Sequence, residues 1–494
     1  ENYYEYIEEL GADRDGYVLT NFPYLNNGPK DLIGNSGKGK EYAYRSYFGR
    51  VMYSYADRYL FQANIRHDGS SRFAKKHRWG TFPSFSAGWV LSEENFMKNL
   101  NWEWLSFLKI RATWGALGNE RIGDFPYMST IAFGNTIFYQ NNGIYFDQTA
   151  SQQKYAIENV TWEKTESTDI GLDISFLNNR LRVNGDYYWK NTKDMLLAMA
   201  IPDFLGFSDP DVNAGKMSTK GYELNVSWND HIGDFSYGIA INFSDFTSKM
   251  GDLQGTQFLG DKVKMEGSEF NEWYGYVSDG LFLTEEDLKN SPKINDKNTQ
   301  LGDIKYKDIS GPDGVPDGKI SPEYDRVLLG SSLPHFLYGG NINLGYKNFD
   351  LSLAFQGVGK QNARLAREMV EPFRNNYGNF PAIIDGNYWS PYNTDEQNAV
   401  AKYPRLTHVN KSSNYAMSDY WLFNGGYFRL KNITLGYTFP KEWMNAIGIK
   451  GARIYASASD LFCLSKYPKG WDPEMGVSEY PITTSILLGV SVNF

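Results

Sequence analysis

Hydrophobic and polar residues alternate with a period of two along most of the chain. The clearest example is the last segment, 485–494, where large apolar residues share one face and small or polar residues lie between them. The apolar positions of that segment are Ile486, Leu488, Val490, Val492 and Phe494. Further segments with this alternation are 108–114, 170–176, 222–228 and 235–244. Because a period of two places successive side chains on opposite faces, each segment is predicted to be a β-strand with one apolar face.

The predicted strands are long and numerous. They run about ten residues each, and roughly thirteen or fourteen of them follow one another. A strand that crosses a membrane needs about 9–11 residues, whereas strands of soluble proteins cluster near five or six. The length and the repetition therefore favour a transmembrane antiparallel β-barrel over a soluble sandwich, which also alternates but with shorter strands.

Short and long connections alternate between the strands. Tight turns are predicted at 56–58, 178–179, 229–233 and 347–348, with a moderately short link at 440–450. Long excursions are predicted at 116–160, 192–216 and 358–425. Outer-membrane barrels are built in this way, with short turns in the periplasm and long loops outside.

The side of the membrane on which each turn lies gives a parity test. If Phe494 lies on the periplasmic side, all the tight turns lie on that side only when residues 246–332 form a single extracellular excursion. The strand-like segment Trp273 to Phe282 is then not a wall strand. About thirteen wall strands remain, beginning at 42–55. An odd number cannot close an up-and-down barrel whose termini share a side, so we expect an incomplete barrel.

Composition excludes several classes of site and partner. The single cysteine, Cys463, rules out an internal disulfide framework and a cysteine-based zinc site. The net charge of −9 argues against a nucleic-acid-binding protein, which needs a basic stripe. Aromatic residues make up 16% of the chain, which suits strands that carry rings on their surface. We find no nucleophile–base arrangement and no spaced pair of carboxylates, so we expect a protein that is not an enzyme.

A series of short motifs follows the predicted strands from about residue 41 onward. Examples are YFGR at 47–50, HDGSSRF at 67–73, LKIRATWG at 108–115, YFRLKN at 427–432 and YPKGWDPE at 467–474. In this order the series resembles the SusC/RagA family of TonB-dependent outer-membrane transporters. The resemblance implies a barrel of about 22 strands whose lumen is filled by an N-terminal plug domain.

On this resemblance, the chain corresponds to roughly the last 13 strands of the barrel, without the plug domain. Residues 1–40 are then expected to be an extracellular loop segment, and residues 41–494 the C-terminal portion of the barrel with long extracellular loops. The resemblance places the protein in the outer membrane of a Bacteroidetes-type bacterium. It implies import of large nutrients, either oligosaccharides or peptides.

The resemblance also implies partners. They are a SusD-like surface lipoprotein that covers the extracellular mouth, the TonB complex acting through the missing N-terminal part, the N-terminal plug and barrel half, and lipid or lipopolysaccharide. The excursion 358–425 is expected to contact the lipoprotein. Two other functions stay open from the residues alone: a secreted β-rich carbohydrate-binding protein, and a passive porin.

One loop has the composition of a cation site. Between 308 and 325 the chain carries several aspartates with glycines and prolines, and Ca²⁺ prefers such oxygen ligands on a tight glycine-bearing loop. The candidate ligands are Asp308, Asp313, Asp317 and Asp325. The spacing departs from that of an EF-hand loop, and the alternative is a solvated turn of Asp, Gly and Pro.

Aromatic pairs supply the candidate contacts for a ligand or partner. Tyr388-Trp389 and Tyr420-Trp421 lie in the longest excursion, where flat rings could pack on a sugar or on another protein. By contrast, Tyr187 and Trp189 lie on the apolar face of a predicted strand and fit the aromatic girdle of a barrel.

Two further kinds of residue are assigned by position. The charges of the inward faces are expected to hydrate the lumen or hold a plug; they include Lys109, Arg111, Arg182, Asp186 and Glu223. The terminal Phe494 is similar to the signal that the barrel-assembly machinery reads.

Overall fold

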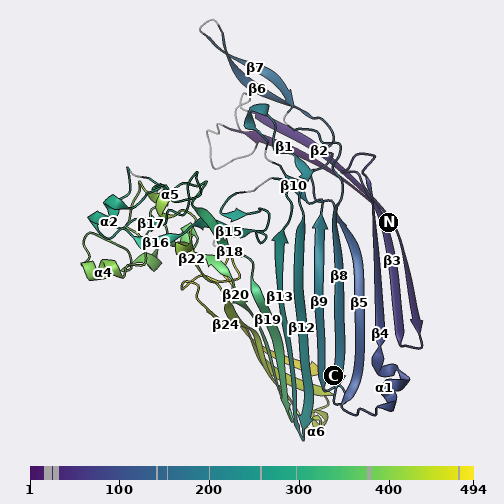
Figure 1. Ribbon diagram of the computed structural model, residues 1–494. Helices are drawn as coiled ribbons and strands as arrows, with labels where there is room; N and C mark the ends of the chain where they lie inside the picture. The colour runs from purple at the N-terminus through teal and green to yellow at the C-terminus, as the bar shows by residue number, and fades with distance from the viewer. Residues whose placement is uncertain are drawn as a thin grey trace. The chain divides into compact units, whose positions relative to one another are not determined.

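The structure is a computed structural model that describes residues 1–15, 25, 33–140, 143–152, 154–199, 201–255, 259–295, 297–374, 380–476 and 479–494. Within these residues, fourteen strands form one sheet, called here the wall sheet, in which the strands follow their order along the chain (Figure 1). The strands of the wall sheet are β1 (Asn2–Arg14), β2 (Ile33–Tyr55), β3 (Tyr59–Ser70), β4 (Trp79–Val90), β5 (Leu105–Asn119), β8 (Glu163–Phe176), β9 (Leu181–Lys193), β12 (Met217–Ile232), β13 (Phe235–Met250), β19 (His335–Tyr346), β20 (Phe349–Lys360), β23 (Tyr427–Thr438), β24 (Gly451–Ser465) and β25 (Ser485–Asn493).

The predicted all-β fold is confirmed, and so are the strands expected from 42 onward. Fourteen strands less β1 leave thirteen, β2 to β25, which is the predicted number. The segment 1–40 differs from the loop that we expected. Asn2–Arg14 is a strand, β1, that pairs with β2 from Arg45 to Ile33, so β2 begins nine residues before the predicted position. Residues 16–24 and 26–32 of that segment lie outside the described residues.

The tight turns follow from local backbone geometry. Between β19 and β20, Tyr346 pairs with Phe349, so only Lys347 and Asn348 form the connection. Lys347 has a φ of +51°, which matches the right-handed twist of the strands that a two-residue hairpin joins. Between β2 and β3, Ala56 and Asp57 have φ values of +51° and +54° in the same role.

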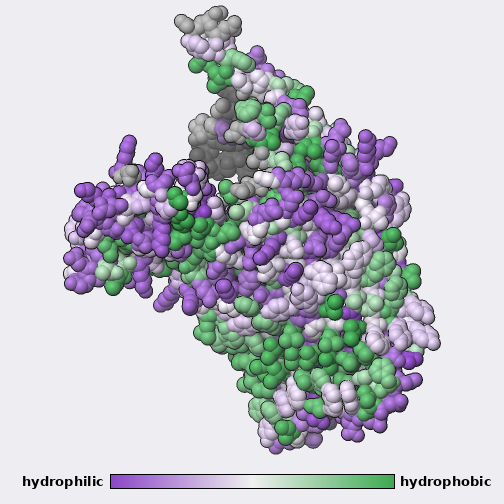
Figure 2. Space-filling model, viewed as in Figure 1, coloured by the Kyte–Doolittle hydropathy of each residue, from purple (hydrophilic) through white to green (hydrophobic). Residues whose placement is uncertain are grey.

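The wall sheet presents apolar side chains that no protein layer covers. On β13, Ile239 and Ile241 lie on one face. Ile241 is 45% exposed even though β13 pairs with β19 within the sheet. The alternate positions of the strand carry small or polar residues, which are Ser236, Gly238, Ala240, Asn242 and Ser244. In Figure 2 hydrophobic residues gather over the lower part of β12, β13 and β19. This alternation is what a strand needs when one face meets lipid and the other meets a polar lumen.

The chain divides into two compact units, which we describe separately. The first consists of Glu1–Gly88, Ala112–Thr168 and Lys190–Met217, and the second of Trp89–Arg111, Asp169–Trp189 and Ser218–Phe494. The first unit holds two smaller pairs of strands. These are β6 (Ile131–Gln140) with β7 (Gly143–Gln152), and β10 (Leu196–Ala198) with β11 (Asp211–Asn213). Its small core contains Phe73, Phe82, Ile122, Val160 and Trp162.

The second unit contains a folded body built from two excursions of the chain. We call the described residues of 251–334 and 361–426 the loop body. Its strands are β14 (Lys262–Val263), β15 (Glu272–Tyr276), β16 (Ser278–Leu281), β17 (Ile304–Tyr306), β18 (Arg326–Gly330), β21 (Asn362–Arg364) and β22 (Leu422–Asn424). Since β15 and β16 belong to small sheets, the prediction that Trp273 to Phe282 is not a wall strand is confirmed.

Helices are short wherever the structure describes the chain. They are α1 (Asn95–Asn99), α2 (Glu285–Asn290), α3 (Arg367–Val370), α4 (Asp395–Ala399), α5 (Lys411–Asn414) and α6 (Lys441–Ala446). None of these described helices has the length and hydropathy of a membrane-spanning helix. In α4, Thr394 and Gln397 form a capping box that satisfies the first free backbone N–H groups.

Candidate functional site

Hydrogen bonds join the two excursions of the loop body to each other. The Tyr276 N–H donates to the Met417 carbonyl over 2.9 Å, and the Arg405 N–H donates to the Gly302 carbonyl over 2.8 Å. Gly275 has no side chain because a Cβ at that position would lie 2.2 Å from the Met417 carbonyl oxygen. Segments more than a hundred residues apart therefore form one packed structure.

A buried carboxylate lies at the centre of this packing. The Asp303 side chain is fully buried and accepts hydrogen bonds from Nδ2 of Asn410 (2.8 Å) and Nδ2 of Asn414 (2.9 Å). Nε of Arg405 lies 2.7 Å from Oδ1 of Asp303. Asn414 also accepts from the Ile304 N–H over 3.0 Å. A buried charge is tolerated only when it is paired and hydrogen-bonded. The contacts with Arg405, Asn410 and Asn414 cross between the two excursions, and the Gln300 N–H adds one from the same excursion.

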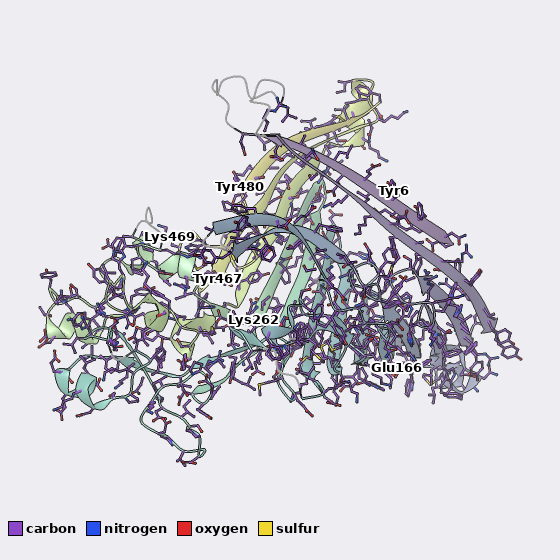
Figure 3. The ribbon with its side chains drawn as sticks, turned by 90° about the horizontal axis from the view of Figure 1, so that it is seen from above. Tyr6, Glu166, Lys262, Tyr467, Lys469 and Tyr480 are labelled. Carbon is purple, nitrogen blue, oxygen red and sulfur yellow. The ribbon has the colours of Figure 1, made fainter. Side chains whose placement is uncertain are left out.

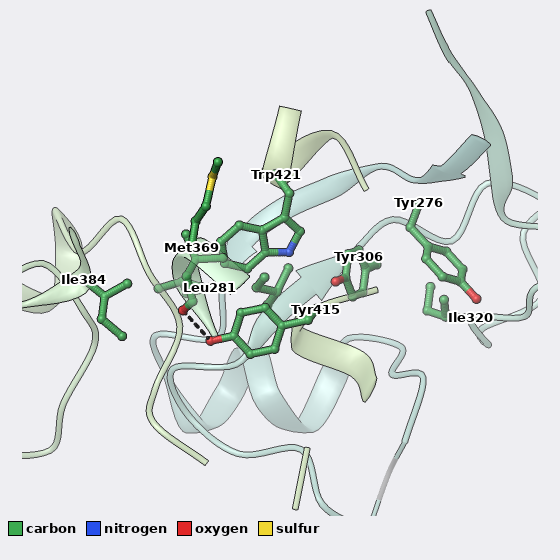
Figure 4. Packing of buried hydrophobic residues seen from close by; sticks show 10 residues of the cluster. Tyr276, Leu281, Tyr306, Ile320, Met369, Ile384, Tyr415 and Trp421 are labelled. Carbon is green, nitrogen blue, oxygen red and sulfur yellow. Dashed lines mark hydrogen bonds between the residues drawn. The ribbon is translucent and has the colours of Figure 1, made fainter. Parts of the chain in front are cut away.

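Aromatic residues form the apolar core beside this network (Figure 4). Trp421 stacks on Tyr415 with ring centroids 5.1 Å apart, and its Nε1 donates to the Asn414 carbonyl over 2.9 Å. Tyr306 donates its hydroxyl to the Ser413 carbonyl over 2.7 Å. Burial disfavours the phenolate, so it raises the pKa of Tyr306 and of Tyr415 above the ordinary value.

This core changes the role of one predicted aromatic pair. Trp421 is 2% exposed, so the structure contradicts the expected contact with a ligand, and the residue is a core residue. The Tyr420 ring packs edge-on against Trp421, and its hydroxyl donates to the Lys402 carbonyl over 2.8 Å. Periodicity could not separate these residues from a surface pair, because the excursion has no regular strand pattern.

The other predicted pair lines an open cavity of about 540 Å³ in the loop body. The lining residues are Glu285, Leu288, Gln300, Leu301, Tyr388, Trp389, Ser390, Pro391, Tyr392, Arg405 and Leu406. Trp389 packs against Gly302, where a Cβ would come within 2.3 Å of the indole. Gly302 has a φ of +82°, a second reason why glycine is required. Tyr392 is 96% exposed at the rim.

Backbone contacts hold the aromatic rim in place. The Trp389 N–H donates to the Tyr403 carbonyl over 2.9 Å, and Nδ2 of Asn393 donates to the Tyr388 carbonyl over 3.0 Å. Nδ2 of Asn398 donates to the Ser390 carbonyl over 2.9 Å. The cavity thus combines preformed aromatic surface with carboxylate, amide, hydroxyl and guanidinium groups. Such a combination suits a hydroxyl-rich or amide-rich ligand.

The aspartates proposed for Ca²⁺ serve mainly as caps of backbone turns. Asp325 is fully buried and accepts from the N–H groups of Ile309 (2.7 Å) and Ser321 (2.7 Å). Asp308 accepts from the Gly318 N–H and Asp317 from the Lys319 N–H. No group of three or more His, Cys, Asp or Glu side chains is gathered for a metal among the described residues. Binding of Ca²⁺ by Asp308, Asp313, Asp317 and Asp325 remains a prediction.

Charged residues on the polar face of the wall sheet contact one another. Arg111 on β5 lies 2.6 Å from Asp186 on β9 and 3.4 Å from both Asp169 and Asp173 on β8. Lys109 lies 3.9 Å from Asp173. The structure therefore brings together three of the residues predicted to face inward, Lys109, Arg111 and Asp186, and adds two aspartates that the sequence pattern did not single out.

Arg429 is a residue whose role sequence reasoning missed. It is 2% exposed on β23, and its Nη2 donates to both carboxylate oxygens of Asp472, at 2.6 and 2.5 Å. Its Nε lies 2.7 Å from Glu474. Burial is the largest single influence and raises the pKa of Asp472. The hydrogen bond from Arg429, the Glu474 N–H and the positive charges of Arg429 and Lys431 together outweigh burial and hold that pKa below its usual value. The motifs at 427–432 and 467–474 both belong to the series that carries the family resemblance. Their sequence does not show that Arg429 of the first pairs with Asp472 of the second.

The terminal residue follows the last strand directly. Phe494 comes after β25 and is exposed, on the apolar face that also carries Val490 and Val492. Its role as an assembly signal remains a prediction.

Comparison with known proteins shows extensive similarity. Residues 3–461 match the family model described as TonB dependent receptor-like, beta-barrel. The chain is 32% identical over 468 residues to TonB-dependent receptor SusC of Bacteroides thetaiotaomicron, covering 91% of this chain and 43% of that protein. It is 31% identical over 453 residues to TonB-dependent receptor P3 of Formosa agariphila, covering 87% of this chain and 42% of that protein.

The structure is also similar to a solved structure. It aligns with the RagAB peptide transporter at a TM-score of 0.78 and 23% sequence identity, over 99% of this chain and 52% of that one. The chain thus spans about half the length of the relatives that it matches.

Proposed function

This chain belongs to the TonB-dependent receptor-like β-barrel family of the outer membrane, and from this membership we propose that it forms the C-terminal wall and loop body of an energised nutrient importer. In this proposal the wall sheet closes around an N-terminal plug, and the TonB complex acts on that plug. A SusD-like surface lipoprotein covers the outer mouth and contacts the loop body. The substrate crosses unchanged, so the protein acts by gating and catalyses no reaction.

The observation that carries the proposal is the open, aromatic-lined cavity of the loop body. Its rim is held by backbone hydrogen bonds, and the Asp303 network beneath it keeps two excursions together. A loop that only connected strands would need neither a buried polar network nor a core of its own. A preformed cavity with rings and polar groups supports a binding role.

We propose an oligosaccharide as the substrate that this cavity contacts. Tyr388, Trp389 and Tyr392 offer flat apolar surface for the C–H face of a sugar ring, and Glu285, Gln300 and Arg405 offer partners for its hydroxyl groups. A peptide is the second candidate, favoured by the structural similarity to a peptide transporter. The same polar groups can serve backbone amides.

Substitution at the cavity tests the binding role. In the full-length protein, Trp389→Ala is expected to weaken oligosaccharide binding about tenfold, because one packing ring is removed. Trp443→Ala is the matched control, since Trp443 is an exposed tryptophan on α6, outside the cavity lining. Binding is measured by calorimetry against oligosaccharide and peptide pools.

Tyr392→Ala separates a binding role from a structural one. Tyr392 is almost fully exposed, so its truncation leaves the loop body intact, whereas Trp389 also packs on Gly302. Weaker binding of peptides alone would select the second candidate. Unchanged binding of both ligand pools in Tyr392→Ala and Trp389→Ala would remove the cavity from the proposal.

Energy dependence tests the transport mechanism. Uptake of the labelled ligand by intact cells is expected to stop when a protonophore collapses the proton-motive force. Continued uptake at the same rate would favour the passive porin. Solubility of the purified chain without detergent would instead favour a secreted carbohydrate-binding protein.

A further inference from the structure

The segment 467–474 between β24 and β25, called here the strap, takes no part in lining the cavity of the loop body. It begins with a tight turn, in which the Trp471 N–H donates to the Pro468 carbonyl over 3.0 Å. Gly470, the third residue of that turn, has a φ of +91°. A turn of this kind favours glycine at its third position, so the sequence Pro-Lys-Gly-Trp folds the strap locally.

Two carboxylates of the strap hold it to the wall sheet. Asp472 accepts two hydrogen bonds from Nη2 of Arg429, which is buried on β23. Glu474 lies 2.7 Å from Nε of Arg429 and accepts from Nε2 of Gln356 on β20 over 3.0 Å. Nζ of Lys431 lies 3.6 Å from Glu474. Because Arg429 is buried, losing one of its carboxylates costs more than losing an exposed ion pair would.

Two aromatic rings of the strap pack on the loop body. The Tyr467 ring lies edge-on against Phe423, with centroids 4.9 Å apart (Tyr467 is labelled in Figure 3). It also lies over Gly425, where a Cβ would come within 3.2 Å of the Tyr467 ring. Trp471 packs against the aromatic core of the loop body. The strap therefore contacts the wall sheet through ion pairs and the loop body through rings.

The Tyr467 contacts lie at one of the two junctions between the loop body and the wall sheet. Only Gln361 separates β20 from β21, and only Gly425 and Gly426 separate β22 from β23. The Gly425 N–H donates to the Gln361 carbonyl over 2.8 Å. Glycine restricts the backbone little, so few dihedral angles at this junction set the direction in which the loop body leaves the wall sheet. A second attachment beside the junction restricts that direction.

We propose that the strap positions the loop body on the wall sheet, with Arg429 as the positioning residue. The cavity is formed within the loop body, by hydrogen bonds such as those of Trp389 and Asn393, so it binds its ligand without the strap. The strap instead fixes how the cavity is presented to the inner face of β20 and β23. Loss of the strap should therefore slow uptake and leave the affinity unchanged. The uptake part rests on the proposed function, and the attachment itself does not.

Hydrogen exchange of the full-length protein in detergent tests the attachment. Asp472→Asn weakens the ion pair with Arg429, and Tyr467→Ala removes the ring contact with the loop body. Each substitution is expected to speed exchange of the junction segments 361–365 and 421–426 by about fivefold or more. Exchange of 387–403, which carries the aromatic rim of the cavity, should not change. Glu479→Gln is the matched control, because Glu479 is an exposed carboxylate of the same connection that accepts from the Gly476 N–H.

The double variant Asp472→Asn/Tyr467→Ala separates a strap from ordinary packing. An attachment is lost when either of its ends is released, so the double variant should exchange no faster than the faster single variant. Effects that multiply would mean that the two contacts stabilise the protein separately, which overturns the proposal. Unchanged exchange of the junction segments in both single variants would also overturn it.

Uptake by intact cells tests the consequence for transport. In Tyr467→Ala we expect uptake of labelled oligosaccharide to be about tenfold slower, with an affinity within about twofold of the parent. Uptake at the parent rate, or a loss of affinity as large as the loss of uptake, would overturn the positioning role. Absence of energy-dependent uptake in the parent would contradict the proposed function instead, and the exchange experiment would still decide whether the strap attaches the loop body.

Discussion

The wall sheet and the loop body use the same kinds of residue in opposite ways. On the wall sheet, large apolar side chains such as Ile241 point away from the protein, and backbone pairing between neighbouring strands holds the structure together. In the loop body, apolar residues such as Trp421 and Met369 are buried, and the backbone forms only short strands. Exposure therefore has two meanings in one chain: exposed residues on the apolar face of the wall sheet meet lipid, and exposed residues of the loop body meet water.

The two regions also place charge differently. Arg111 and its aspartate partners lie half-buried on the polar face of the wall sheet, where an ion pair can stay hydrated. Asp303 in the loop body is fully buried and depends on Arg405 and two asparagines. The loop body is thus stabilised like a small soluble domain, and single substitutions should affect it without affecting the wall.

The largest effect is expected from Asp303→Ala. The substitution leaves the Arg405 guanidinium buried without its carboxylate, so the loop body should lose about 3–5 kcal/mol of stability. Limited proteolysis reports on the loop body, and the heat-dependent mobility of the protein on detergent gels reports on the wall. Asp313→Ala is the control, because Asp313 is an exposed aspartate of the same loop body. Unfolding of the loop body and of the wall sheet at the same temperature would show that the two regions are not independent.

A charge on the apolar face should destabilise the wall next most strongly. Ile241→Arg places a guanidinium near the middle of the apolar band, at a cost of about 2–4 kcal/mol. Tyr392→Arg places the same charge at an exposed position of the loop body and should cost almost nothing, because that side chain meets water. Denaturant unfolding in lipid vesicles measures both. Equal effects of the two substitutions would contradict the distinction between lipid and water.

Asp325→Ala should have a smaller effect that is confined to one turn. The carboxylate accepts backbone N–H groups of Ile309 and Ser321, and leaving these without a partner costs about 1–3 kcal/mol. Protease cleavage between 308 and 325 should increase, and Asp317→Ala, which removes a single cap, should do so less. EDTA should not change the cleavage of the parent. Protection that requires Ca²⁺ would instead support the cation site.

The smallest effect is a dependence on alkaline pH. The pKa values of Tyr306 and Tyr415 are raised by burial above the ordinary 10.0, so their contribution to stability is complete below pH 10.0. It is lost as the pH rises from there through the pKa of the folded state, by up to about 1.4 kcal/mol per pH unit for each residue. Ultraviolet absorbance of tyrosinate measures the ionisation of the two tyrosines, and limited proteolysis at each pH measures the stability of the loop body.

Tyr306→Phe serves as the control for the pH effect. It removes one titrating group and its hydrogen bond to Ser413, so the variant should start less stable and lose stability less steeply with pH. An unchanged slope would show that Tyr306 is not responsible.

Much of the wall could be predicted because its determinants are local and repeated. Alternation sets the faces, and turn residues such as Lys347 set the hairpins, so the strands from 42 onward and the exclusion of Trp273 to Phe282 were confirmed. The segment 1–40 was predicted less well. Its first strand carries tyrosines and glutamates with little alternation, so only its pairing with β2 identifies it.

The contacts inside the loop body could not be predicted from the sequence. Tyr388-Trp389 and Tyr420-Trp421 look alike in the sequence, yet one pair lines a cavity and Trp421 lies in the core. The pairing of Arg429 with Asp472 joins residues 43 positions apart, and Asp303 meets Asn414 across 111 positions. Such contacts depend on how the excursions fold back on each other.

The sequence by itself thus determined the class of fold, the strands of the wall and the side on which their apolar residues lie, because a strand's periodicity is written in neighbouring residues. The tertiary structure decided which aromatic rings line an open cavity, which lie in a core, and which carboxylates cap turns. Those properties arise from contacts between distant segments, whose free energies depend on burial and geometry that no local pattern contains.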